Sequence, residues 1–200
     1  MRVTPAAACG SGPAAVQVTR ATHACSTTAT PWQRCYIGIG ANLGDAAATV
    51  VDAVAALADL PGCRLTQVSS LYRSAPVAAS GPDFFNAVAE VDTTLSPEAL
   101  LDALQRIESA FGRQRPYANA PRTLDLDLLL HGDGVQQTPQ LTLPHPRLHL
   151  RAFVLLPLLE LAPDLALPGR GALADAVPGT AGQRLQRLHA LHKPAPTISR

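Results

Sequence analysis

The sequence predicts an α+β fold, a sandwich in which helices pack on a central, mostly antiparallel sheet. Two observations support it. Short stretches with strand-like alternation and two amphipathic helical patterns follow one another between residues 36 and 130. Their order is strand, helix, strand, strand, helix, strand, which is typical of two split β-α-β halves in a ferredoxin-like arrangement. A chain of 200 residues is long enough for one such domain with a well-buried core, or for one domain and a tail.

The first half of the pattern begins at Tyr36. Residues 36–40 form an apolar strand that runs into a turn at residues 41–44. Asp45 can cap the helix that follows, and its apolar stripe is Val50, Val54 and Leu57. Pro61-Gly62 ends this helix. Residues 64–72 then alternate like a strand, residues 74–82 form a loop with two prolines and a glycine, and residues 85–91 form the next strand.

The second half starts at Ser96-Pro97-Glu98, which offers a hydroxyl N-cap, a proline in the first turn and an acid near the helix N-terminus. The predicted buried stripe is Leu100, Leu101, Leu104, Ile107 and Phe111, and Gly112 ends the helix. A strand at residues 124–130 and a turn at 132–134 follow. Beyond Pro146 we expect another helix ending near Pro163, and a short helix around Gln183 to Leu191.

Composition excludes several functional classes. The net charge of +1 and an aromatic content of 4% do not fit a dedicated nucleic-acid binder, so we expect no nucleic-acid partner. No run of 18 apolar residues is present, so we expect no membrane span. The cysteines (Cys9, Cys25, Cys35 and Cys63) lack C-x-x-C spacing, which favours free thiols in the cytoplasm over a zinc site.

We expect three regions: a disordered extension at residues 1–34, a catalytic domain at 35–168 and a C-terminal extension at 169–200. Residues 1–34 contain no Asp or Glu and show no hydrophobic periodicity. An acid-free leader with Arg, Ser and Thr also resembles an organelle transit peptide, and that alternative stays open.

The most informative stretch is Pro121-Arg-Thr-Leu-Asp-Leu-Asp-Leu128. On a strand, Asp125 and Asp127 project from one face roughly 6.6 Å apart, while the leucines project into the core. Two parallel carboxylates can hold a pair of Mg²⁺ ions together with substrate phosphates. Arg113 and Arg115 lie in the preceding loop and Arg122 lies beside the acids, and guanidinium groups bind phosphate oxygens in a bidentate way. The pattern predicts phosphoryl-transfer chemistry on a triphosphate.

Residues 112–121 carry two arginines without an apolar stripe, and we expect a loop that closes over bound nucleotide. On the strand that begins after Pro82, Phe84 and Asn86 share one face, where they could stack on and hydrogen-bond a planar heterocycle. The glycines at 38, 40 and 44 do not have the spacing of a dinucleotide-binding loop, and no P-loop is present.

Together these residues resemble the 6-hydroxymethyl-7,8-dihydropterin pyrophosphokinase family, over about residues 35–168. The matching stretches are residues 36–44, 69–74, 82–87, 105–108, 112–113, 121–127, 143–145 and 151–153. The resemblance implies transfer of pyrophosphate from ATP to the hydroxymethyl group of 6-hydroxymethyl-7,8-dihydropterin in tetrahydrofolate biosynthesis, with two Mg²⁺ ions as cofactors. It implies metal binding by Asp125 and Asp127 and catalytic assistance from Arg113 and Arg122.

The same resemblance implies the substrate contacts. Those to the pterin would come from Ser74, Val77, Phe84, Asn86 and Phe153, and those to ATP from Gln105, Glu108, Arg115, His145 and Arg151. We expect a monomer. Two other classes remain possible on the sequence: a nucleotidyltransferase, which also uses an Asp-x-Asp pair but releases pyrophosphate instead of AMP, and a ferredoxin-like RNA-binding module, which the low aromatic content and charge disfavour.

Overall fold

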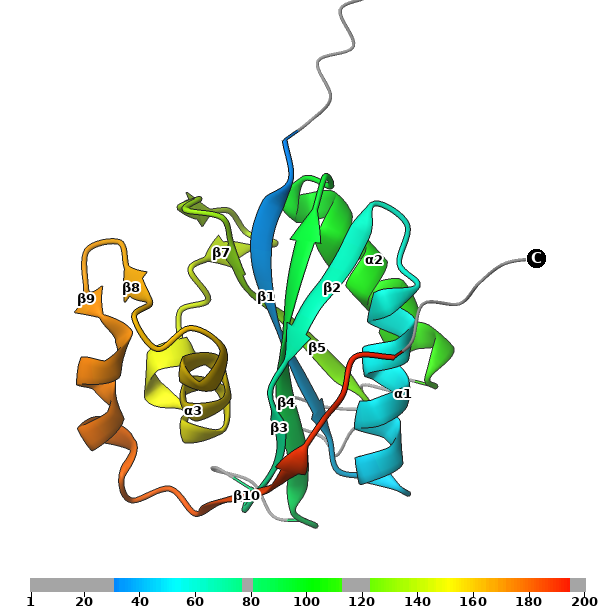
Figure 1. Ribbon diagram of the computed structural model, residues 1–200, viewed down its shortest axis with the longest axis vertical. Coiled ribbons are helices and arrows are strands. Elements are labelled where there is room, and N and C mark those ends of the chain that lie inside the picture. The colour runs from blue at the N-terminus through cyan, green and yellow to red at the C-terminus, as the bar shows by residue number, and fades with distance from the viewer. Residues whose placement is uncertain (1–30, 77–80, 113–122, 195–200) are drawn as a thin grey trace, which may run out of the picture.

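A six-stranded antiparallel sheet separates two layers of helices in the computed structural model (Figure 1). The structure describes residues 31–76, 81–112 and 123–194. The strand order is β10-β3-β4-β1-β5, with β2 also paired to β4. The strands are β1 (Gln33–Ala41), β2 (Cys63–Val68), β3 (Ser70–Ser74), β4 (Phe84–Thr93), β5 (Asp125–His131) and β10 (Leu185–Ala190). The predicted α+β class and the element order through β5 are confirmed.

The helices divide between the two faces of this sheet. Helices α1 (Ala46–Ala58) and α2 (Pro97–Ala110) cover one face, and α3 (Ala152–Leu161) covers the other (Figure 1). Short elements complete the described chain: the hairpins β6 (Gln136–Gln137) with β7 (Thr142–Leu143) and β8 (Ala166–Leu167) with β9 (Gly171–Ala172), and the 3₁₀ helices η1 (Leu148–Leu150) and η2 (Leu173–Thr180). None of the described helices has the length and apolar character needed to cross a membrane.

The caps predicted for α1 and α2 are present. The side chain of Asp45 accepts a hydrogen bond from the backbone N–H of Ala48 at 3.0 Å, and that of Ser96 accepts one from Ala99 N–H at 3.2 Å. Each bond satisfies a first-turn donor that the helix itself leaves without a partner. The apolar stripes then face the sheet, with Val50 and Leu57 of α1 fully buried.

The strand predicted over residues 64–72 is interrupted at Ser69. Ser69 N–H donates to the Val88 carbonyl at 2.9 Å, while its side-chain oxygen accepts from Val88 N–H at 2.9 Å. The side chain thus replaces a ladder bond, and β2 and β3 both pair with β4, on the two sides of the break.

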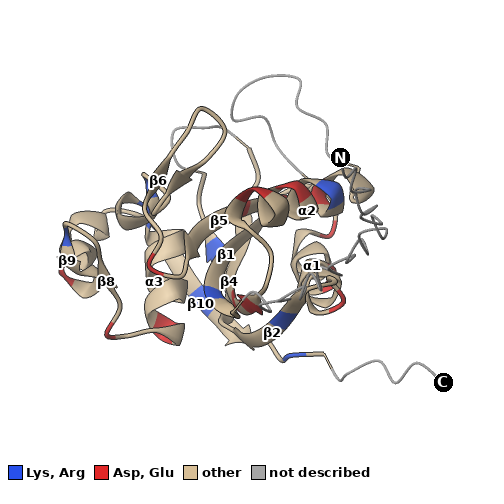
Figure 2. Ribbon diagram, turned by 90° about the horizontal axis from the view of Figure 1, so that it is seen from above, with Lys and Arg blue, Asp and Glu red and all other residues tan. Residues whose placement is uncertain are grey.

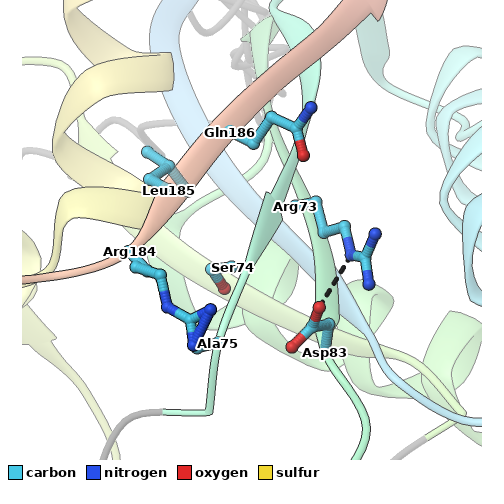
Figure 3. A pocket seen from close by; sticks show the side chains of 7 residues that line it. All are labelled: Arg73, Ser74, Ala75, Asp83, Arg184, Leu185 and Gln186. Carbon is cyan, nitrogen blue, oxygen red and sulfur yellow. Dashed lines mark hydrogen bonds and ion pairs between the residues drawn. The ribbon is translucent and has the colours of Figure 1, made fainter.

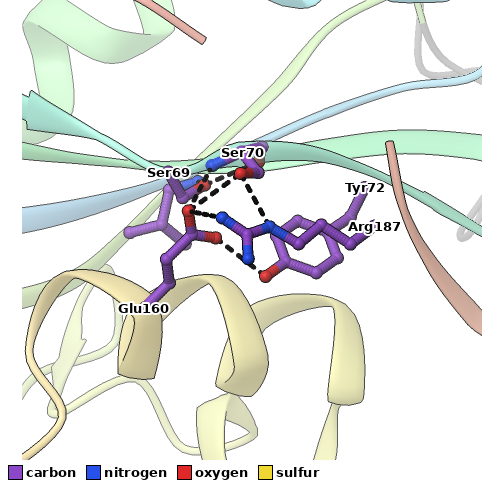
Figure 4. Close-up of polar contacts among 6 residues, drawn as sticks. Ser69, Ser70, Tyr72, Glu160 and Arg187 are labelled. Atoms are coloured by element: carbon purple, nitrogen blue, oxygen red, sulfur yellow. Dashed lines mark hydrogen bonds and ion pairs between the residues drawn. The ribbon is translucent and has the colours of Figure 1, made fainter. Parts of the chain in front are cut away.

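The C-terminal prediction is wrong in one respect: Leu185–Ala190 form a strand, and no helix spans Gln183 to Leu191. β10 pairs with β3 and closes that edge of the sheet. A polar cluster fastens it to α3: Glu160 accepts bonds from Ser70, Tyr72 and Arg187 at 2.8–3.1 Å (Figure 4). The helix is absent because edge pairing supplies backbone hydrogen bonds that a short, isolated helix could make only at a high entropic cost.

The N-terminal boundary also shifts. β1 begins at Gln33, inside the stretch predicted to be a disordered extension, because its register with β4 continues to Gln33 opposite Thr93. Just before it, Trp32 stacks under the guanidinium of Arg64 with 4.2 Å between the Cζ atom and the ring centroid. The rest of the predicted extension, residues 1–30, lies outside the described residues.

Candidate active site

The two carboxylates of β5 lie on the α3 side of the sheet. Their neighbours Leu124, Leu126 and Leu128 are at most 4% exposed, so the predicted alternation is confirmed. The side chain of Asp127 is 37% exposed, which leaves its oxygens accessible from solvent. An apolar strand therefore delivers two carboxylates to a partly open surface.

Glycines lie directly opposite these carboxylates on the neighbouring strand. Gly40 pairs with Asp125 and Gly38 with Asp127, and Gly40 pairs on its other side with Asn86 of β4. A Cβ atom at Gly40 would stand 3.5 Å from the Asn86 side-chain oxygen. Because Gly40 carries no side chain, a flat or phosphorylated group can approach the backbone between Asp125 and Asn86, whereas at Gly38 the Leu129 side chain covers the sheet, 3.5 Å from where a Cβ atom would stand.

Asn86 and Ser74 form the opposite side of this surface. The Asn86 amide donates to the Ser74 hydroxyl at 3.0 Å, and both side chains are almost fully buried. Phe84 is opposite Ser74 in the register of β3 and β4 and is half-buried. The structure therefore brings together three of the five predicted pterin contacts, Ser74, Phe84 and Asn86, whereas Val77 lies outside the described residues.

A pocket of about 260 Å³ adjoins Ser74 at the edge of the sheet (Figure 3). Its lining comes from β3, the start of β4 and the C-terminal segment: Arg73, Ser74, Ala75, Asp83, Arg184, Leu185 and Gln186. The Arg73 guanidinium is paired with Asp83 at 2.7 Å. No sequence pattern predicts Arg184 at this position, because it comes beside Ser74 through the pairing of β10 with β3.

The segment leading into α3 contributes charged and aromatic groups. Arg151 immediately precedes α3, and its Nη1 lies 3.8 Å from Asp127 Oδ2. The same guanidinium lies over the ring of Phe153, 5.5 Å from its centroid. The structure thus joins a predicted ATP contact to a predicted metal ligand and a predicted pterin contact, although they are far apart in sequence.

His145 is held close to these groups by its backbone. Its N–H donates to the Leu129 carbonyl of β5 at 2.9 Å, and its ring Nδ1 accepts from Arg147 N–H at 3.2 Å. Burial lowers the pKa of His145 and the cations of Arg151 and Arg147 lower it further, while Asp127 and Asp125 oppose the shift. The ring is therefore neutral near pH 7, with its proton on Nε2 as a hydrogen-bond donor.

The two predicted ATP contacts of α2 differ in their surroundings. Gln105 is exposed. Glu108 is 1% exposed, and its carboxylate accepts the backbone N–H of Leu126 at 2.8 Å. Since β5 is an edge strand, this bond satisfies a donor that no neighbouring strand reaches, and it fixes the backbone between the two aspartates. Sequence analysis missed this structural contact of Glu108.

The predicted arginines of the loop before β5 lie outside the described residues. These are Arg113 and Arg122, predicted to assist transfer, and Arg115, predicted to contact ATP; most of the predicted lid lies there too. Across the ranges that are described, no group of three or more His, Cys, Asp or Glu side chains is arranged to hold a metal. A pair of carboxylates remains, which fits Mg²⁺ because that ion takes one or two carboxylates and completes its shell with water and substrate phosphate oxygens.

Comparison with known proteins places the chain in one family. Residues 36–163 match the family model for 7,8-dihydro-6-hydroxymethylpterin-pyrophosphokinase. The 2-amino-4-hydroxy-6-hydroxymethyldihydropteridine pyrophosphokinase of Pseudomonas aeruginosa is 45% identical over 157 residues, covering 78% of this chain and 97% of the relative. The enzyme of the same name from Haemophilus influenzae is 41% identical over 155 residues, covering 77% and 97%.

Solved structures of low sequence identity share the fold. Plasmodium falciparum HPPK-DHPS, crystallised with pteroate, superposes with a TM-score of 0.64 at 12% identity, over 82% of this chain and 47% of that one. An HPPK-DHPS in complex with substrates gives a TM-score of 0.58 at 13% identity, over 74% and 43%. This chain thus spans less than half of those proteins. The matched residues include both β5 carboxylates, Asn86, His145 and Arg151, and the chain belongs to the 7,8-dihydro-6-hydroxymethylpterin-pyrophosphokinase family.

Proposed function

We propose that this chain performs the reaction of its family at the surface between β5, β4 and the start of α3. The chain transfers pyrophosphate from ATP to the hydroxymethyl group of 6-hydroxymethyl-7,8-dihydropterin, a step of folate biosynthesis. The observation that carries the site assignment is the position of Gly40, which lies between Asp125 of β5 and Asn86 of β4 and has no side chain, with Asp127 on the same face as Asp125. This arrangement places carboxylates that can bind metal and phosphate on one side, and an amide that can hydrogen-bond a heterocycle on the other.

The reaction joins the hydroxymethyl oxygen to the β-phosphorus of ATP. The bond from that phosphorus to the oxygen bridging to the α-phosphate breaks, and AMP departs with the electron pair, while the hydroxyl proton passes to water. Such transfers depend on positioning and on charge neutralisation more than on covalent help from the protein. Accordingly, the proposal assigns no nucleophilic side chain.

Asp125 and Asp127 would hold two Mg²⁺ ions. When bound, the metal supplies positive charge against the phosphate oxygens and orients them for displacement. The support comes from the donor set: two carboxylates on one strand face, a residue without a side chain (Gly40) opposite Asp125, and partial exposure of Asp127. Glu108 supports both ligands from the open edge of β5 through its bond to Leu126 N–H.

We assign the pterin to the surface formed by Ser74, Phe84 and Asn86, with Phe153 on the α3 side and Val77 from the loop. Gln105, Glu108, His145 and Arg151 are assigned to ATP, along with Arg115. Arg113 and Arg122 are assigned to charge stabilisation during transfer. A guanidinium that already lies near Asp127 is well placed to bind a phosphate brought to the same carboxylate.

The remaining proposals concern the whole molecule. We propose that the substrate-binding and catalytic groups lie within residues 35–168 and that the protein acts as a monomer in the cytoplasm. The predicted extension at residues 169–200 is not separate from this domain over its described part, because β10 is a strand of the central sheet. The thiols of Cys35 and Cys63 are free, which agrees with a reducing compartment.

A product assay tests the activity directly. The protein is incubated with ATP, Mg²⁺ and 6-hydroxymethyl-7,8-dihydropterin, and AMP and inorganic pyrophosphate are quantified separately. AMP should form in a one-to-one ratio with the pterin diphosphate. Release of pyrophosphate in place of AMP would identify a nucleotidyltransferase and would overturn the proposal.

A further inference from the structure

Gln183 lies beyond the residues that match the family model and has no place in the site described so far. We propose that Gln183 is a positioning residue that holds Arg151 in the orientation required for nucleotide binding. The inference rests on the role in ATP binding proposed above for Arg151. It concerns a side chain that touches neither substrate and acts only through the backbone.

The geometry is a two-bond clamp around one residue. Gln183 Nε2 donates to the Leu150 carbonyl at 2.7 Å, and Gln183 Oε1 accepts from Ala152 N–H at 2.8 Å. These two backbone groups flank Arg151. A planar amide that bonds on both sides of a residue fixes the direction in which that residue's side chain leaves the backbone.

The start of α3 explains why such a clamp is needed. Arg151 occupies the N-cap position with φ −120° and ψ 109°, and its side chain makes no capping hydrogen bond. Instead it extends towards Asp127, with a closest distance of 3.8 Å. A Ser or Asp at this position would cap the helix but could not reach the site. Gln183 therefore caps α3 at Ala152, while the Arg151 side chain extends towards the site.

The segment that carries Gln183 is itself held in place by neighbouring backbone contacts. The backbone N–H of Gln183 donates to the Thr180 carbonyl at 2.9 Å, and Thr180 is 4% exposed. Two residues after Gln183, Leu185 pairs with Ser74 at the start of β10. The segment that carries Gln183 is thus anchored on both sides, and its side chain can impose its geometry on residues 150–152.

The test separates positioning from a general structural role. Full-length wild type, Gln183→Ala, Arg151→Ala and the double variant are compared in the AMP assay, with ATP and pterin varied in turn. Affinity for a non-hydrolysable ATP analogue with Mg²⁺ is measured by calorimetry. Gln137→Ala, which truncates an exposed glutamine on β6, is the matched control. Gln183→Glu keeps the acceptor for Ala152 N–H and loses the donor to Leu150, and it serves if the alanine variant fails to fold.

Gln183→Ala should raise the KM for ATP and the analogue Kd about tenfold, since misplacing a binding group by about 1 Å costs this much or more. The KM for pterin should stay within about twofold, and Gln183→Glu should fall between wild type and alanine. In the Arg151→Ala background the second substitution should add nothing. An unchanged KM for ATP in Gln183→Ala, equal losses for both substrates, or an additive double variant would overturn the inference alone. Wild-type ATP binding by Arg151→Ala would overturn the assignment of Arg151 as well.

Discussion

The two faces of the central sheet differ in chemistry, although they are built from the same strands. On the side of α1 and α2 the strands bury a continuous set of apolar groups: Ile37, Ile39, Ala87, Ala89, Val91, Leu126 and Leu128. On the side of α3 they present Ser70, Tyr72, Ser74, Asn86, Glu90, Asp125 and Asp127 as well as apolar residues. One face therefore holds the fold together by burial, and the other combines packing with a polar surface on which chemistry can occur.

On the α3 face, Glu160 and Asp127 show the difference between a carboxylate that stabilises the fold and one that can bind a ligand. Glu160 accepts hydrogen bonds from Ser70, Tyr72 and Arg187, all between 2.8 and 3.1 Å (Figure 4). The Arg151 contact to Asp127 is 3.8 Å, longer than a hydrogen bond, and the Asp127 side chain is 37% exposed against 23% for Glu160. A carboxylate surrounded by fixed protein donors stabilises the fold, whereas one that keeps exposed oxygens can accept a metal and a phosphate.

Glu90 resembles Glu160, because it is also surrounded by hydrogen-bond donors of the protein. Glu90 is 2% exposed and bonds to Tyr36 at 2.9 Å and to Thr66 at 2.8 Å. Burial, reinforced by the bond to Glu90, raises the pKa of Tyr36 to about 12, so this phenol remains protonated as a donor. Charges of both signs are spread over the described helices and strands (Figure 2). The site is therefore distinguished by the arrangement of its charges, and not by an overall excess of one sign.

The largest expected effect is the loss of activity on substitution of Asp127, on the polar face of the sheet. Asp127→Asn preserves size but weakens metal binding, and turnover should fall by at least about 10²-fold, as at other sites that stabilise transition-state charge. The melting temperature should change by no more than about 2 °C, because the side chain is partly exposed. Asp133→Asn, an exposed turn acid, is the control and should keep full activity. More than about a tenth of wild-type turnover in Asp127→Asn would contradict its assignment as a metal ligand.

The next largest expected effect is a loss of stability on substitution of Leu128, the residue after Asp127 on β5, which points to the apolar face. Leu128→Ala removes a side chain that is 3% exposed and should lower the free energy of unfolding by about 2–5 kcal/mol. Activity per folded molecule should be largely retained. Urea unfolding measures the loss, and Leu188→Ala, at a half-exposed position of β10, should change stability by less than about 0.5 kcal/mol. Similar losses for the two variants would show that the described core does not govern stability.

A smaller, pH-dependent effect is expected at Glu160. Burial raises its pKa, but the bonds from Tyr72 and Ser70 and the charge of Arg187 together lower it below the ordinary 4.5. A lowered folded-state pKa means that the ionised carboxylate contributes stability above the unfolded pKa and loses that contribution as the pH falls through the folded value. Glu160→Gln should therefore cost about 1–2 kcal/mol near pH 7, since bonds to charged groups are worth about this much at a partly exposed site.

Urea unfolding of both proteins between about pH 3 and pH 7 checks this expectation. The difference between them should shrink as the pH falls through the lowered pKa of Glu160, because the wild-type carboxyl then also becomes neutral. Asp102→Asn, on the exposed side of α2, provides the comparison for a solvent-exposed carboxylate. A difference that stays constant with pH would show that the cluster acts through packing and not through charge.

The smallest effect concerns a helix on the apolar face. Ser96→Ala removes the cap of α2 and should cost about 1 kcal/mol, whereas Ser96→Asp should retain the stability because Asp also caps well. Thermal unfolding is sufficient for the measurement. Equal destabilisation by both substitutions would mean that the hydroxyl matters through some contact other than the cap.

Sequence reasoning succeeded where the signal is local. The caps of α1 and α2 and the alternation of β5 depend on neighbours within a few residues, and each is confirmed. It failed for β10 because five of its six residues are exposed and none of them forms an apolar stripe. β10 pairs with β3 through backbone N–H and C=O groups, which nearly every residue has. The pairing therefore cannot be predicted from a pattern of side chains.

Part of the candidate site was equally hidden from the sequence. Glu108 looks like one more polar residue on a helix, and only the proximity of α2 to the edge of β5 explains its burial against Leu126 N–H. The role of the β1 glycines follows from the strand register, which places them opposite Asp125 and Asp127. Gln183 bonds to backbone atoms 31 and 33 residues away, a relation that residue spacing cannot reveal.

The sequence by itself determined the fold class, the helix starts and the fact that two carboxylates share one face of an apolar strand, because periodicity and capping are properties of short segments. The tertiary structure alone decided which distant segments meet those carboxylates. It placed Asn86 on the other side of Gly40 from Asp125, Arg151 within 3.8 Å of Asp127, and Gln183 at the start of α3. The physical reason is that strand pairing and packing bring these groups together over separations at which the chain carries no local signal.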